Sequence, residues 1–421
     1  MYKYLNKSYL PPMLGSSMEY YDIALYIYMA PILTQVFLPD ILKTKQFFIY
    51  FFIEFLASIM QILGAKFYGR IGDLVGRKKA IVSAMQGVFL ITLMIIFIPT
   101  YKEAGLISTF LFLLSRLFQS FFIGGEYNGG AIYCLELEKD TSKHGIISGL
   151  YCATTAFGIL IASIVAAIIN YFGSEYFRYA YAVSFLFLFF IYKYKKNMKP
   201  VLNKAKIFKE ELNNLDNDAK NKAFRNFIVI SISALFFGVL YGLPTKVFNS
   251  LLPVYFDINI NLLMFANVVF LFIYIFLLIF AGYMSCKYKA KDIMFYASLI
   301  TAIVSIPLLI LVETKMILMF ILAKAVLITL TAFFIGPFHG FSIKLFREGV
   351  RYRKISSAYA IGKCLATLIL ACSFYIFELT HSLVSVGLIL TIAAIIMSGA
   401  LYYADAKKYK LFEGTQILPS N

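Results

Sequence analysis

The sequence predicts an all-α membrane protein whose twelve transmembrane helices form two six-helix bundles. Three observations support this fold class. Hydrophobic residues make up 61% of the 421 residues and the mean hydropathy is +0.79, whereas a soluble domain is about half apolar. Apolar runs long enough to cross a bilayer, about 20 residues each, recur along the chain. Basic residues gather in alternate segments between these runs.

The apolar runs are continuous and rich in Leu, Ile, Phe and Ala, which favours helices over the short alternating strands of an outer-membrane barrel. Six runs precede the polar segment 193–225 and six follow it. We therefore predict an N-terminal bundle at 1–192, a cytoplasmic linker at 193–225, and a C-terminal bundle with a cytoplasmic tail at 226–421. The predicted spans are 12–38, 46–68, 80–98, 106–133, 145–172, 176–192, 227–255, 262–286, 293–312, 316–338, 355–377 and 383–403.

The net charge of +17 is distributed as in a membrane protein, not as in a nucleic-acid-binding protein. With the N-terminus inside, 30 basic residues lie in the inside segments and five in the outside segments. The positive-inside rule then places both termini in the cytoplasm. We expect a multi-pass protein of a bacterial inner membrane, with no nucleic-acid partner.

No pattern for a cofactor or a catalytic site is present. The five cysteines have no paired spacing and the three histidines are far apart in sequence, so neither disulfides nor a metal site is indicated. The sequence has no nucleotide-binding loop and no nucleophile beside a base, which argues against an enzyme.

The loop after the second span carries the pattern GxxxDxxGRK, formed by Gly69, Asp73, Gly76, Arg77 and Lys78. Glycines allow a tight loop to bring two helix ends together. An acid can face the positive N-terminal end of another helix, and an arginine can bind a carboxylate with two hydrogen bonds. The pattern therefore predicts a loop that docks charged groups onto neighbouring helices.

This pattern resembles the signature of the major facilitator superfamily. The resemblance implies that Asp73 docks on the second half near the eleventh span, where Arg351 belongs to the same gating set. It also implies that Arg77 meets Glu136 at the inner end of the fourth span. In the family these contacts latch a transporter that is open outward.

Three further stretches resemble the metabolite:proton symporter branch, which includes proline/betaine, ketoglutarate and citrate carriers. They are GSSMEYYDIALY from Gly15, SRLFQSFFIGGEYNGGAIYCLE from Ser115, and LFREGVRYRKISSAYAIG from Leu345. The resemblance implies a monomer in the lipid bilayer that imports a small polar metabolite with protons by alternating access. A proline- or betaine-like osmolyte is the preferred substrate. A di- or tricarboxylate symporter and a non-transporting membrane sensor are the alternatives.

The chain departs from these family patterns at a few positions. The departures bear on the latch, the ion coupling or the substrate, and they leave the fold prediction unchanged. The loop after the eighth span, GYMSCKYKAKD from Gly282, is a second copy of the loop after the second span, with Cys286 in place of the acid. The other departures are Leu74 where a basic residue is usual, Gln61 and Ile62 in place of Arg-Pro, Ser120 in place of Gly, and Arg347 in place of Pro.

Eight charged residues lie deep within predicted spans, away from the span ends, where a charge costs about 2.5 to 3.5 kcal/mol or more. Arg116 lies about 16 Å from the outer end of its span, so it does not reach water by extending along the helix. Glu19 and Asp22 reach a similar depth on the first span. We predict that these three residues carry the proton coupling, with Asp22 or Glu19 as the partner of Arg116.

The remaining intramembrane charges are Glu54 and Glu126 in the first half and Lys246, Lys324 and Lys363 in the second. An acidic half facing a basic half suits a zwitterion, and tyrosines of the first span can add cation–π contacts to a quaternary amine. These tyrosines can instead serve packing, and the lysines can hold a carboxylate substrate. The predicted substrate-cavity residues are Tyr20, Tyr21, Gln119, Glu126, Lys324 and Lys363.

The charge distribution makes a topological prediction. Reporter tags at Met1, near Asn213 and at Asn421 should all report the cytoplasm, because 30 of the 35 basic residues between spans lie on that side. A periplasmic signal from the tag near Asn213 would contradict the division into two bundles.

Overall fold

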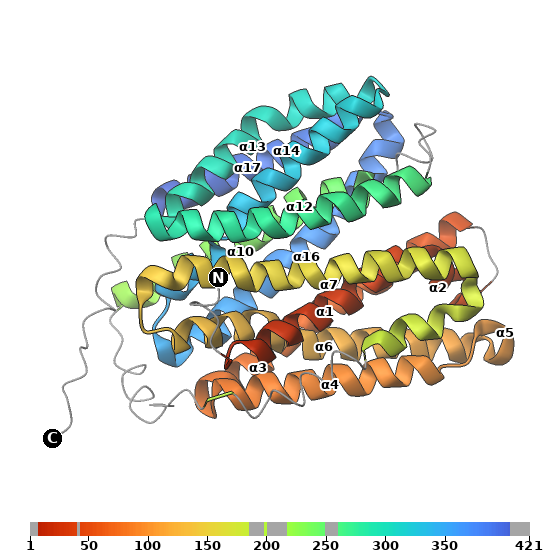
Figure 1. Cartoon of the computed structure of the whole chain (residues 1–421), viewed down its shortest axis with the longest axis horizontal. Coiled ribbons are helices and arrows are strands. Elements are labelled where there is room, and N and C mark those ends of the chain that lie inside the picture. Colours follow the sequence, from red (N-terminus) through yellow and green to blue (C-terminus); the bar gives the residue numbers. More distant parts are fainter. Residues whose placement is uncertain (1–6, 40–42, 185–197, 200–216, 249–259, 405–421) are drawn as a thin grey trace.

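The computed structural model describes residues 7–39, 43–184, 198–199, 217–248 and 260–404. All regular elements in these ranges are helical (Figure 1). Nine of the described helices are long and apolar enough to cross a membrane. The predicted linker 193–225 lies largely outside the described residues, and so does the second part of the predicted sixth span, residues 185–192.

The described residues of the first half form longer helices and short connecting turns, and residues 177–184 are also helical. The longer helices are α1 (Leu10–Tyr28), α2 (Ala30–Phe37), α3 (Lys43–Leu74), α4 (Arg77–Phe97), α6 (Leu106–Leu137) and α7 (His144–Phe172). The short elements are α5 (Tyr101–Ala104) and the 3-10 turns Thr141–Lys143 and Ser174–Tyr176.

The second half begins with α10, inside the stretch predicted to be linker. Its helices are α10 (Asn217–Gly242), α12 (Ile260–Lys287), α13 (Ala290–Glu313), α14 (Ile317–Ile335), α15 (Phe338–Ser342), α16 (Glu348–Thr380) and α17 (Leu383–Tyr403). A π-helical turn at Leu243–Val247 follows α10, and a 3-10 turn at Ile343–Leu345 precedes α16.

Besides the early start of α10, several other predicted boundaries differ from the structure. The run 12–38 is interrupted at Met29, just before α2, whose second residue Pro31 has no N–H to donate to a continuous helix. The run 316–338 likewise ends at Ile335, ahead of Pro337. In contrast, α16 begins at Glu348, seven residues before the predicted start. Its first turns are polar, and they pack against Asp73 and Arg77 of the first half.

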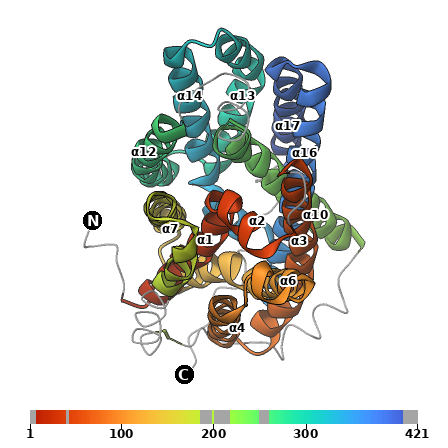
Figure 2. The ribbon, with the colours of Figure 1, turned by 90° about the vertical axis from the view of Figure 1, so that its right-hand side faces the viewer.

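The helices form two groups that correspond to the two halves (Figure 2). Helix α7 packs along α12 and α3 packs along α16, so these two pairs join the groups. We call the end of the molecule that carries the loop between α3 and α4 the motif end. The two groups lie close together there and diverge toward the opposite end, which we call the far end (Figure 1).

Glycines allow the two groups to touch at the motif end. A Cβ atom added to Gly282 of α12 would lie 2.6 Å from the Cα of Gly149 on α7, so the two backbones are in direct contact. Next to them, the Ser148 hydroxyl donates a hydrogen bond of 2.6 Å to the Gly336 carbonyl and accepts one of 3.1 Å from the His339 N–H. The α7–α12 junction is therefore closed by backbone packing and hydrogen bonds.

This packing predicts the effect of a side chain at Gly282. The substitution Gly282→Val should destabilise the purified protein by about 1 to 3 kcal/mol, measured by its thermal unfolding, because the side chain meets backbone that cannot move aside. Gly399→Val is the matched control, since a Cβ atom at this helical glycine meets nothing within 4 Å. Equal melting temperatures for the two variants would contradict the close α7–α12 contact.

Candidate functional site

Arg77 is the centre of a cluster of charges at the motif end. Its Nε and Nη2 atoms donate to the two carboxylate oxygens of Glu136 at 2.9 and 3.0 Å. Its Nη1 atom donates to Asp73 at 3.0 Å, and Nη2 also reaches the carbonyl of Glu348 on α16 at 2.6 Å. The contact with Glu136 is the one that the family resemblance implies.

Asp73 connects α3 to the start of α16. Its two oxygens accept hydrogen bonds from the backbone N–H groups of Tyr352 and Arg353, at 3.1 and 3.0 Å. Arg351 adds a contact of 3.1 Å from the second half to Glu136. Both halves therefore meet in one network of charge-assisted hydrogen bonds, which are roughly twice as strong as neutral ones.

The glycines of the motif make this approach possible. A Cβ atom at Gly69 would lie 2.5 Å from the Cα of Arg353, so α3 and α16 touch backbone to backbone. Gly76 has a φ angle of 133°, which residues with a side chain rarely adopt. Lys78 points elsewhere and donates to the Met198 carbonyl at 2.7 Å.

The second copy of the loop occupies the equivalent position on α12. Cys286 accepts a hydrogen bond of 3.2 Å from the N–H of Ile146, near the start of α7. The end of α12 thus meets the start of α7 as the end of α3 meets the start of α16. A neutral thiol takes the place of the Asp73 carboxylate in this second junction.

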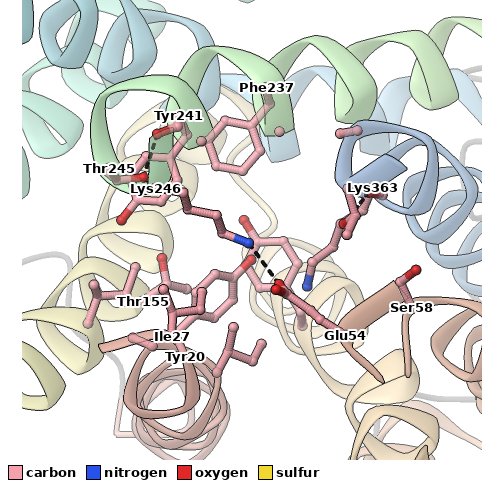
Figure 3. Close-up of a pocket in the computed structure, with 18 of the residues that line it drawn as sticks. Tyr20, Ile27, Glu54, Ser58, Thr155, Phe237, Tyr241, Thr245, Lys246 and Lys363 are labelled. Carbon is pink, nitrogen blue, oxygen red and sulfur yellow. Dashed lines mark hydrogen bonds and ion pairs between the residues drawn. The ribbon is translucent and has the colours of Figure 1, made fainter. Parts of the chain in front are cut away.

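A pocket lies between the two halves and is lined by helices from both (Figure 3). Its polar and aromatic lining includes Tyr20, Tyr28, Glu54, Ser58, Gln61, Arg116, Ser120, Tyr127, Thr155, Phe237, Tyr241, Thr245, Lys246, Tyr274, Tyr359, Lys363 and Thr367. Gln61 and Ser120, two of the departures from the family pattern, therefore face the pocket.

Charged side chains from both halves meet in the pocket. Lys246 of the second half donates to Glu54 of α3 at 2.7 Å (Figure 3). Lys363 of α16 also points into the pocket, and its ammonium lies 5.9 Å from the centre of the Tyr20 ring (Figure 3). Among the residues that the structure describes, Lys363 forms no ion pair within 4 Å. It is therefore available to an anionic group of a ligand.

Three of the predicted residues line the pocket: Tyr20, Arg116 and Lys363. The other predicted cavity and coupling residues do not line it. Tyr21 donates to the Ala180 carbonyl at 2.5 Å, and Lys324 is buried within the second half, where it bonds Asn267. The predicted placement of these two side chains in the substrate cavity is therefore not what the structure shows. The remaining residues that do not line the pocket are Glu19, Asp22, Gln119 and Glu126.

Arg116 and Asp22 are linked through Gln119, not by a direct ion pair. The Gln119 amide nitrogen donates to Asp22 at 3.1 Å, and its oxygen accepts from Arg116. Asp22 also accepts hydrogen bonds from Thr92 at 2.9 Å and Ser184 at 2.7 Å. The sequence predicted the depth of Arg116 and Asp22 but placed them in contact, whereas Gln119 occupies the space between them.

Glu19 lies in a different environment. It is 1% exposed, and no described residue hydrogen-bonds to either of its oxygens. The charged groups that interact with it are Glu126 and Lys363. Glu19 is therefore not a partner of Arg116.

Sequence analysis missed several pocket residues. Glu54 and Lys246 were recognised as intramembrane charges, but nothing in the sequence indicates that they pair across the two halves. Tyr127 and Tyr359 belong to the stretches that resemble the symporter branch, and their rings pack 5.3 Å apart. Their position inside these stretches was the one available signal.

Comparison with known proteins identifies the family. The model of the Major Facilitator Superfamily matches residues 13–371. The chain belongs to this superfamily. The superfamily comprises membrane transporters and not enzymes, so the predicted fold class, the resemblance and the absence of an enzymatic role are confirmed.

Curated relatives in the superfamily are transporters of small solutes. The chain is 22% identical over 413 residues to the glycine betaine/proline/ectoine/pipecolic acid transporter OusA of Dickeya dadantii, covering 93% of this chain and 81% of that protein. It is 30% identical over 173 residues to the proline/betaine transporter of Salmonella typhimurium, or 41% of this chain and 35% of that protein.

Solved structures share the fold at lower identity. The proton:xylose symporter XylE, bound to a bromodeoxyglucose, matches with a TM-score of 0.73 at 17% identity over 95% of both chains. A bacterial homologue of the iron transporter ferroportin in an outward-facing state matches with a TM-score of 0.71 at 13% identity, over 96% of this chain and all of that one.

The network around Arg77 predicts the effect of opening it. Arg77→Ala leaves Glu136 and Asp73 short of a buried partner, so the motif end should open more often. In a variant that keeps only Cys286, whose thiol lies at the α7–α12 junction of the motif end, maleimide labelling should become at least about tenfold faster, for about 1.4 kcal/mol lost.

Lys79→Ala is the matched control for this measurement, because Lys79 is exposed in the same helical turn. Asp73→Asn should act in the direction of Arg77→Ala. Labelling rates that stay equal to the control in both motif variants would show that the cluster does not hold the motif end closed.

Proposed function

We propose that this chain is a proton-coupled secondary transporter that imports a small zwitterionic osmolyte of the proline/betaine kind by alternating access. The observation that carries the proposal is the pocket between the two halves, which combines free cationic groups with a dense aromatic lining. The named solutes of the curated relatives support the same substrate class.

The pocket offers complementary sites for the two ends of such a substrate. Arg116 and Lys363 can bind a carboxylate, and Lys246 is already paired with Glu54. The rings of Tyr20, Tyr127 and Tyr359 pack against one another in the same wall and present aromatic faces. A quaternary ammonium over such a face gains about 0.5 to 2 kcal/mol per ring.

The proton site proposed here is Asp22, in its network with Gln119 and Arg116. Asp22 is fully buried and accepts three hydrogen bonds from neutral donors, while the cation reaches it only through Gln119. A rotation of Gln119 or Arg116 changes how well the ionised form of Asp22 is stabilised. Substrate binding to Arg116 in the pocket can therefore change the affinity of Asp22 for a proton.

Alternating access follows from the contacts at the motif end. The Arg77 network and the α7–α12 junction hold that end closed, and the helix groups diverge toward the far end (Figure 1). With the motif end in the cytoplasm, this arrangement corresponds to an outward-facing state in a bacterial inner membrane. The predicted bundle boundaries at 1–192 and 226–421, and a monomeric state, belong to this proposal.

A dicarboxylate is the second candidate substrate, because three cationic residues and one acid line the pocket. Neither Arg116 nor Lys363 forms an ion pair with a described residue, so each can bind a carboxylate. Counterflow in proteoliposomes separates the two. Internal unlabelled glycine betaine should drive uptake of labelled glycine betaine, and ketoglutarate should not. Counterflow with ketoglutarate alone would transfer the assignment to dicarboxylates, and binding of either without counterflow would indicate a sensor.

The Asp22 network predicts a separation of two activities. Asp22→Asn should lower the steady-state accumulation of glycine betaine by at least about tenfold for each pH unit of gradient, because one proton per cycle is no longer coupled. Exchange of internal for external substrate should persist, since it needs no net proton movement. The exposed residue Asp292 provides the control Asp292→Asn. Unchanged accumulation in Asp22→Asn would exclude Asp22 as a proton carrier.

A further inference from the structure

Two buried glutamates remain without a role in the proposed cycle. Glu19 of α1 and Glu126 of α6 are 1% and 2% exposed. No described residue hydrogen-bonds to the two oxygens of Glu19 or to Oε1 of Glu126. Unpartnered buried polar atoms of this kind are rare in folded proteins and call for an explanation.

The Glu126 side chain of α6 packs against the face of α1 that carries Glu19. Oε1 of Glu126 lies 2.2 Å from the position that a Cβ atom would occupy at Gly15, so Glu126 packs directly against α1. Glu19 follows Gly15 by four residues, which places it one turn further along that face. The two groups interact electrostatically, and neither lines the pocket.

The groups around the pair explain why its oxygens have no donors. From α7, the Tyr151 hydroxyl donates to the Tyr127 carbonyl at 2.8 Å. From α16, the Tyr352 hydroxyl donates to the Gly125 carbonyl. These two phenols are thus bound to backbone oxygens. Two more phenols, those of Tyr20 and Tyr359, interact electrostatically with Glu19 but do not hydrogen-bond to it. From α4, the atoms nearest to Gly15 belong to the non-ionisable side chain of Met85.

The charges that act on the pair come from three helices. Asp22 of α1 acts on Glu126, and Lys363 of α16 is the one described cation among the groups that act on Glu19. Lys363 itself interacts with Glu19 and Glu54 and is repelled by Lys246 and Arg116. A single ammonium can balance one carboxylate. A second carboxylate that stayed ionised and buried without a partner would be strongly destabilising. The pair therefore requires a second positive charge, which a bound proton can supply.

We propose that Glu19 and Glu126 form a second proton-binding site, separate from Asp22, and that Lys363 of the second half competes with the proton for it. This inference rests on the proposed function, because the proton belongs to the same transport cycle. A substrate carboxylate that binds Lys363 withdraws the ammonium from the pair, which then keeps its proton.

When the substrate leaves, Lys363 returns to the pair and the proton is released. The O–H bond of the carboxyl group breaks, its electron pair stays on the carboxylate oxygen, and the proton passes to water on the open side. Lys363 belongs to the half opposite the pair, so the exchange depends on how the two halves are arranged. Substrate binding and proton binding thereby become mutually dependent.

The transport test measures how steeply accumulation depends on the pH gradient. In proteoliposomes with the membrane potential clamped at zero, the double variant Glu19→Gln/Glu126→Gln should accumulate glycine betaine about tenfold less per pH unit than the native chain. Combined with Asp22→Asn, accumulation should vanish while exchange persists. Asp292→Asn is the control.

An unchanged slope in the double variant overturns the second site. If accumulation by the native chain depends on a sodium gradient and not on the pH gradient, the pair binds sodium, and the proposed proton site is also overturned. Absence of any pH-driven accumulation in the native chain would refute the proposed function, and the second site is then decided by the spectroscopic test alone.

The spectroscopic test requires no transport. Infrared spectra of the purified full chain should contain a band of a protonated carboxyl group that shifts in deuterated water and is absent from the double variant. Glycine betaine should strengthen this band in the native chain. In Lys363→Met the band should already be at full strength and should not respond to glycine betaine. These spectra are compared in the Asp22→Asn background, so that Asp22 contributes no carboxyl band. A band that survives there in the double variant, or is unaffected by Lys363→Met, overturns the proposal.

Discussion

The bidentate contact between Arg77 and Glu136 is the interaction on which the observed state of the molecule depends. It lies at the point where α3, α4, α6 and α16 converge, and it fixes the orientation of a guanidinium that also binds Asp73 and the Glu348 carbonyl. Because Asp73 in turn binds the backbone of α16, one cation organises the closure between the halves. In the proposed cycle, the pocket opens toward the far end while this closure holds.

The placement of charge in the pocket is a second consequence of closing two different halves on each other. Glu54 from the first half is neutralised by Lys246 from the second, and Lys363 has no such partner among the described residues. The two lysines are therefore not equivalent. One fixes the relative position of the halves around the pocket, and the other is available for a ligand or for the buried acids.

The fold could be predicted from the sequence because long apolar runs indicate bilayer spans. The contacts of GxxxDxxGRK with Glu136 and α16 were implied by its resemblance to the superfamily signature, and the structure contains both. The site was predicted only in part. Periodicity gives the depth and face of a side chain such as Arg116 on its own helix, but not the rotation of that helix against its neighbours. This rotation is why Gln119 lies between Arg116 and Asp22, and why Lys324 faces the interior of its own half.

The two copies of the motif close the molecule by different physical means. At the α3–α16 junction, carboxylates and guanidinium groups form charge-assisted hydrogen bonds, whose strength depends on exclusion of water. At the α7–α12 junction, Gly149 and Gly282 bring the backbones together and Cys286 contributes a weak acceptor. Separating the second junction therefore costs dispersion and backbone contact, whereas separating the first exposes buried charge. The buried charges of the motif end lie at the α3–α16 junction, and α16 also carries Lys363 into the pocket. A change at Lys363 and a change at the Arg77 cluster are thus connected by one continuous helix.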